Sequence, residues 1–150
     1  MEGIDAKMAA RVWQRVKAPE PPAQVAGRSL SDMLFQSHGL AGLYQGLQRR
    51  MTGAAAARAR ELYHRQERLS ACLKGMILLS GSPIPALPPM VPGTGSLRSI
   101  LEGCCHRERR LLAGLSGGCP EENPAPVFHL LAEQTVQRIA TVLELLGNLP

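Results

Sequence analysis

The stretch SPIPALPPMVPGTG, residues 82–95, decides how this 150-residue chain is organised. It holds five of the twelve prolines together with two glycines, which predicts a long crossover segment and not a tight turn. Because proline breaks the interior of a helix, long helices belong in the stretches without proline. Three such runs exist: residues 23–82, 93–119 and 127–149.

The composition favours helices over sheets. Hydrophobic residues make up 45% of the chain, which is enough for one core, but aromatic residues make up only 3%. Leucine carries the hydrophobicity, with 22 Leu against 12 Ile and Val together. Since strands prefer β-branched and aromatic side chains, an all-β or α/β fold is a poor match.

Start and stop signals divide the chain into four helices. The capping-box spacing of Ser29 and Asp32 predicts a first start, Ser80-Gly81 a stop, and Asn123-Pro124 a last start. We therefore expect an all-α, four-helix up-down bundle over residues 29–149, in two helical pairs joined by the proline-rich crossover. Residues 1–28, with Trp13, are expected to form an N-terminal arm or short helix. The expected helices span about 30–51, 54–80, 96–116 and 124–147.

Apolar stripes predict which helix faces turn inward. The third helix carries Leu101, Cys104, Leu111 and Leu115 on one line, with Glu108 at the centre of that line. A carboxylate there is costly to bury unless it is paired or ligating. The last helix has the cleanest stripe, made of Phe128, Leu131, Thr135, Ile139, Val142 and Leu146.

The charged and cysteine residues exclude several classes of protein. Fourteen arginines and three lysines against twelve acidic residues give a net charge of +5. Nucleic-acid binding is not expected, because no aromatic side chains are interleaved with the arginines. The cysteines show no CxxC spacing, which argues against a zinc ribbon, and we expect Cys104 and Cys105 to be buried and structural. No signal-peptide core or membrane span is present, so we expect a cytoplasmic protein with reduced thiols.

One motif carries coordination chemistry. Glu61-Leu-Tyr-His64 places a carboxylate and an imidazole three residues apart on the second helix, where both can reach one ion. The alternative for this pair is surface ion pairing of Glu61 with Arg58 or Arg65. Glu108 is expected either to act as a third ligand or to pair with an arginine.

The segment from Arg60 to Leu69, continuing to Met76–Gly81, resembles the second helix of ferritin-like, rubrerythrin-type domains. The resemblance covers residues 29–149 as two halves of two helices. It implies a di-iron carboxylate centre, built from a Glu on each of two helices and a Glu-x-x-His on each of the other two.

The resemblance implies metal ligands at Glu61 and His64 on the second helix and at Glu108 on the third. The first-helix Glu falls at Ser37, or at His38 if the register shifts by one.

The fourth helix departs from the pattern. Its Glu-x-x-His falls either on Gln134 and Gln137 or on Thr135 and Arg138. Glutamine is a weak substitute for an anionic ligand, and arginine repels a cation.

These residues predict a divergent ferritin-like protein that binds a single ion, iron or another divalent transition metal, or none. Complete di-iron oxidase chemistry is not expected, and the sequence favours a non-enzymatic role. The alternative is a non-catalytic helical scaffold or interaction module that kept the fold and lost the metal site. An arginine-rich binder of anionic polymers is a third alternative. A homodimer is an open expectation, as is an unidentified protein partner.

Overall fold

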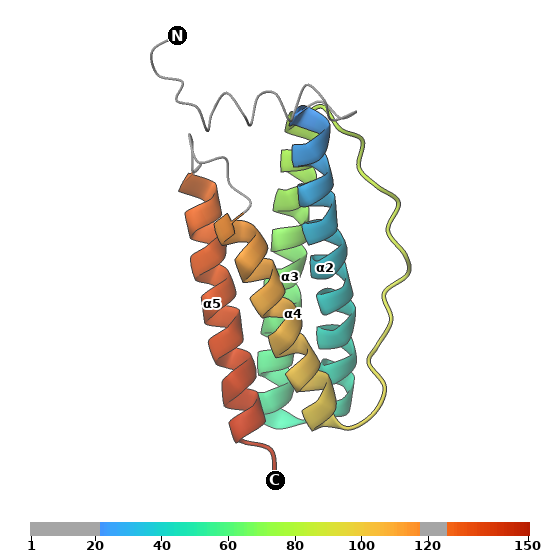
Figure 1. The fold of residues 1–150 in the computed structure, drawn as a ribbon. Coiled ribbons are helices and arrows are strands. Elements are labelled where there is room, and N and C mark those ends of the chain that lie inside the picture. Colours follow the sequence, from blue (N-terminus) through green and yellow to red (C-terminus); the bar gives the residue numbers. More distant parts are fainter. Residues whose placement is uncertain (1–21, 118–125) are drawn as a thin grey trace.

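A computed structural model describes residues 22–117 and 126–150 as a bundle of four helices (Figure 1). The fold is all-α in this part of the chain, as the leucine-rich composition predicts. The helices are α2, Pro22–Arg50; α3, Gly53–Leu79; α4, Leu97–Gly117; and α5, Pro126–Gly147.

The four helices form two antiparallel pairs joined by a long crossover. Helix α2 packs mainly on α3, and α4 mainly on α5, while smaller contacts join α2 to α4 and α3 to α5. The segment between α3 and α4 runs along the outside of the bundle and returns to the opposite end (Figure 1). Helices α3 and α4 therefore run in the same direction, so the up-down alternation holds within each pair but not between the pairs.

Helix α2 begins earlier than the sequence predicts. Its backbone is helical from Pro22, so Ser29 lies inside the helix and does not cap it. Proline suits the first position of a helix, and no proline follows it before Arg50. The last part of the predicted arm is thus helical. The rest of the arm, with Trp13, and the predicted start at Asn123 lie outside the described residues.

Local signals explain the two helix ends that flank the crossover. Helix α3 ends in a Schellman motif, in which the N–H of Ser82 donates to Ile77 O at 3.2 Å and the N–H of Gly81 donates to Leu78 O at 3.0 Å. Gly81 has φ +82°, a conformation that glycine adopts without strain. At the start of α4, the Ser96 hydroxyl accepts a hydrogen bond from the N–H of Ser99 at 3.1 Å.

The crossover packs directly on α2. A Cβ added to Gly42 would lie 2.9 Å from the Val91 carbonyl oxygen, and one added to Gly46 would lie 2.8 Å from Pro92 Cβ. These glycines lie one turn apart, so they form a flat strip on which the crossover rests. His38, one turn before Gly42, also holds the crossover against α2, because its Nε2 donates to the Pro88 backbone carbonyl at 2.6 Å.

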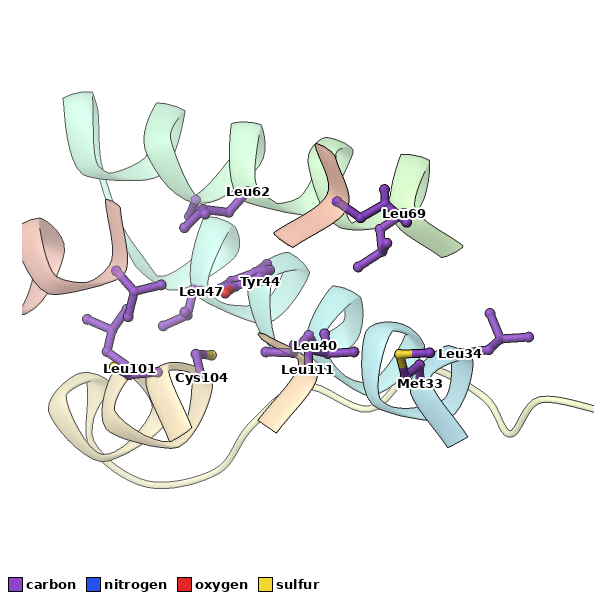
Figure 2. Packing of buried hydrophobic residues seen from close by; sticks show 14 of the residues in the cluster. Met33, Leu34, Leu40, Tyr44, Leu47, Leu62, Leu69, Leu101, Cys104 and Leu111 are labelled. Carbon is purple, nitrogen blue, oxygen red and sulfur yellow. The ribbon is translucent and has the colours of Figure 1, made fainter. Parts of the chain in front are cut away.

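A leucine-rich core fills the space between the helices (Figure 2). Leu34, Leu40, Leu73, Leu101 and Leu111 are among its fully enclosed side chains. Across the described residues, no helix is both long and apolar enough to cross a membrane.

The inward face of α5 is rotated relative to the predicted stripe. Its buried residues follow a strict four–three spacing. Arg138 occupies the position expected for Ile139, which is only half-buried. The full set of buried residues is Leu131, Thr135, Arg138, Val142 and Leu145.

Candidate functional site

Buried polar side chains from all four helices form two hydrogen-bonded groups inside the bundle. Each is buried, although apolar residues surround it, and together they form what we call the polar belt. Its members are Ser37 and Tyr44 on α2, Gln66 and Ser70 on α3, Glu108 on α4, and Thr135 and Arg138 on α5.

The centre of the polar belt is a two-point ion pair between Glu108 and Arg138. Arg138 Nε donates to Glu108 Oε2 at 2.8 Å, and Arg138 Nη2 donates to Glu108 Oε1 at 3.2 Å. The exposed fractions of the two side chains are 0% for Glu108 and 1% for Arg138. The planar guanidinium matches both carboxylate oxygens, which is the geometry that allows a charge pair to be buried.

Two neighbours complete the hydrogen bonding of this pair. The Tyr44 hydroxyl donates to Glu108 Oε2 at 2.8 Å, and Arg138 Nη2 also donates to Thr135 Oγ1 at 2.8 Å. Thr135 in turn donates to the Leu131 carbonyl one turn earlier on α5. Burial, together with the nearby Glu108 carboxylate, raises the pKa of Tyr44 well above its usual value of 10. Tyr44 therefore stays protonated and keeps donating.

The second part of the polar belt joins α2 to α3. Ser37 Oγ lies 2.7 Å from Ser70 Oγ and donates to the backbone carbonyl of Gln66 at 3.2 Å. Gln66 Nε2 donates to Ser37 Oγ at 2.9 Å. Gln66 Oε1 is buried and has no hydrogen-bond partner in the described part of the chain. Of the two α2 residues that the sequence offered for the first-helix position, Ser37 faces the interior and His38 is only half-buried.

The Glu61–His64 motif lies on the outside of the bundle. Glu61 Oε1 pairs with Arg65 Nη2 at 2.6 Å, one turn along α3, with 56% of the Glu61 side chain exposed. His64 is exposed, and its ring makes an edge contact with the ring of Tyr63. Ion pairing of Glu61 with Arg65 is the alternative that the sequence raised for this motif.

The two predicted registers of the fourth helix are now distinguished. Thr135 and Arg138 face the interior, whereas Gln134 and Gln137 are exposed. Pairing of Glu108 with an arginine, one of the two roles predicted for it, is confirmed, and the partner is Arg138.

The predicted metal ligands do not form a ligand set in this arrangement. Glu61 and His64 lie outside the bundle, while both oxygens of Glu108 accept hydrogen bonds from a cation. A metal ion at Glu108 would lie beside the fixed positive charge of Arg138, which disfavours it. Within residues 22–117 and 126–150, no three His, Cys, Asp or Glu side chains lie together as a metal site.

The adjacent cysteines belong to the core. Cys104 and Cys105 are free and buried, as predicted. Burial, with a smaller contribution from the Glu108 carboxylate, raises the pKa of Cys104 to about 12. This thiol is therefore a small apolar side chain and not a nucleophile. Cys119 lies outside the described residues.

The sequence placed Arg138 at a site position in one of two registers of the fourth helix, but it did not identify Arg138 as the partner of Glu108 or Tyr44 as a member of the site. A signal was present for Arg138, because Leu131, Thr135, Arg138, Val142 and Leu145 follow a heptad pattern as regular as the stripe that was chosen. Tyr44 is fully buried, so its hydroxyl needs a buried partner, which Glu108 supplies.

Comparisons with protein-family models, with curated proteins and with solved structures find no match to this chain. The fold and the polar belt therefore carry the functional argument.

Proposed function

We propose that this protein is a ferritin-like four-helix bundle that serves as a non-catalytic helical scaffold or interaction module. The observation that carries the proposal is the contact of Arg138 with both carboxylate oxygens of Glu108. In this proposal, the Arg138 guanidinium lies beside Glu108 where ferritin-like domains would hold a metal ion.

The arrangement of the chain supports the ferritin-like part of the proposal. Two antiparallel helical pairs are joined by a crossover that runs the length of the bundle (Figure 1). Glu108 projects to the interior from the third helix, at the position that the resemblance selects. All four helices also contribute polar groups to the polar belt, as expected for an interior that once held a polar site.

The hydrogen bonding of the polar belt supports the non-catalytic part. A catalytic acid, base or ligand must be able to change its partner during a reaction. Glu108 instead accepts from Tyr44 and Arg138, with both oxygens used, inside a closed core. Breaking such a buried pair is strongly unfavourable, so the belt suits a structural role.

Metal content tests this proposal directly. The protein is purified without chelators, loaded with iron(II), manganese(II) or zinc(II), and its bound metal is quantified beside the Glu61→Ala/His64→Ala variant and a Glu108→Gln variant. We expect amounts far below one ion per chain, equal in all three proteins. One ion per chain in the wild type, lost in either variant, would establish the metal-binding prediction instead.

The expected homodimer is a separate prediction within this proposal. Val136 and Leu143 lie seven residues apart on α5, and each exposes about half of its surface, 52% and 46%. Light scattering across a concentration series measures the mass directly. A constant monomer mass would remove the homodimer and leave the scaffold role to another partner.

A further inference from the structure

A small pocket opens between α3 and α5, beside the polar belt and outside the core. Its volume is about 220 Å³. Its lining is Arg65 and Arg68 from α3 and Gln134, Gln137 and Arg138 from α5. The lining thus consists of three arginines and two glutamines, and it contains no acidic residue.

The sequence spacing explains why these side chains converge. Arg65 and Arg68 are three residues apart on α3, and Gln134 and Gln137 are three residues apart on α5, so each pair shares one helix face. Of the neighbouring helix pairs, α3 and α5 contact each other least, which leaves a groove between these faces.

The arginines that line the pocket carry more positive charge than their carboxylate partners neutralise. Arg138 is held in place by Glu108 and Thr135, so its position is fixed before any ligand arrives. Arg65 pairs with Glu61 on the surface, an interaction that a stronger anion can replace. Arg68 has no ion pair within the described residues. The three arginines have two carboxylate partners, Glu61 and Glu108, so one positive charge is left without an ion pair.

We infer that the pocket formed by Arg65, Arg68, Gln134, Gln137 and Arg138 binds a small anion that carries a phosphate group. Guanidinium groups match phosphate oxygens with paired hydrogen bonds, and the amides add neutral donors. A phosphate monoester carries close to two negative charges at neutral pH, more than one carboxylate offers.

The size of the pocket limits the ligand. The pocket volume is about 220 Å³. That space admits a phosphate group with a short organic substituent. This inference does not depend on the ferritin-like proposal, because anion binding requires only the lining side chains, Arg138 among them, and not the ancestry of the bundle.

Calorimetric titration at constant ionic strength tests the inference on the full chain. The two probes are inorganic phosphate and glycerol 3-phosphate, which separate the free anion from an ester. We expect saturable binding of one equivalent, weakened about tenfold or more by Arg68→Gln, because a hydrogen bond to a charged group is lost. Arg60→Gln is the matched control, since Arg60 is an exposed arginine of α3 outside the pocket lining, and it should leave the affinity unchanged.

A second variant acts in the opposite direction. Glu61→Gln removes the surface partner of Arg65, so phosphate should bind about twofold more tightly. The inference is overturned if neither probe saturates the protein, or if Arg68→Gln and Arg60→Gln weaken binding equally. Binding of heparin without binding of either small probe would overturn it too, and would indicate general surface attraction.

Discussion

At the scale of single residues, Arg138 and Glu108 define the character of this molecule. Two opposite charges lie in a leucine-rich core, and each depends on the other for hydrogen bonds. Taking two charges out of water is costly, and their attraction offsets this only while both are present. The pair is therefore a point at which the fold is sensitive to a single change.

Removing one partner should be far more harmful than removing the whole network. We expect Arg138→Met to lower the free energy of unfolding by about 3–5 kcal/mol, because Glu108 is left charged and unpaired in the core. The triple variant Tyr44→Phe/Glu108→Leu/Arg138→Met replaces the network with apolar groups and should recover most of that loss. Urea unfolding followed by circular dichroism measures both. Equal losses in the single and triple variants would contradict this account of the pair.

The Cys104 thiol gives a second residue-scale prediction. With its pKa at about 12, almost none of it is thiolate at pH 8, so native protein should not react there with iodoacetamide. The half-buried Cys72 should react before Cys104, and Cys104 only after unfolding. Peptide mass spectrometry distinguishes the sites, and labelling of Cys104 in the native protein as fast as Cys72 would be inconsistent with its burial.

The same thiol sets a direction for the effect of pH. Its pKa is raised on folding, so the native state holds the proton more tightly than the unfolded chain does. Tyr44 is shifted in the same direction. The stability they contribute is complete below about pH 9 and falls as the pH rises towards 12. Unfolding curves between pH 8 and 11 should show this decline, and it should be shallower in a Cys104→Ala/Tyr44→Phe variant than in the wild type.

At the scale of elements, the contact between α2 and the crossover is set by glycine. Glycine inside a helix is about 1 kcal/mol less favourable than alanine, so Gly42 and Gly46 need a compensating reason. The close approach of Val91 and Pro92 supplies it.

Adding a methyl group at these glycines should loosen the crossover. We expect Gly46→Ala to push Pro92 outward and to speed proteolysis within residues 80–96, even though alanine favours the helix. Gly75→Ala on α3 is the matched control, because nothing lies within 4 Å of a Cβ added there. The control should stabilise the protein by up to about 1 kcal/mol. Unchanged crossover cleavage in Gly46→Ala would show that the glycine strip is not needed.

At the scale of the whole molecule, proline placement together with local start and stop signals was sufficient to predict four helices in two pairs with a crossover. Helix ends were less predictable, because a good capping residue such as Ser29 can also lie inside a continuing helix. Proline placement and capping signals both depend on residues that lie close together in the sequence. Because these signals are local, the architecture could be predicted from the sequence.

The functional reading depended on rotation of the helices about their axes, which neighbouring residues do not specify. Leu62, Gln66 and Leu69 are buried on α3. Glu61 and His64 lie close to Leu62 in the sequence, but both are exposed. The contact between Glu108 and Arg138 joins residues 30 positions apart on separate helices. One register of the fourth helix placed Arg138 at a site position, but the sequence predicted an arginine partner for Glu108 without selecting Arg138 among the fourteen arginines.

The central claim is that the bundle is complete with its internal ion pair and needs no metal ion. A ligand that binds the folded state alone raises the free energy of unfolding by an amount that grows with the logarithm of its concentration above the dissociation constant. The most direct measurement is therefore the urea unfolding midpoint of the wild-type chain in chelator and in excess iron(II), manganese(II) or zinc(II). Our account predicts the same midpoint in every condition. A midpoint that rises with one of these ions, and does not rise in a Glu108→Gln variant, would contradict it.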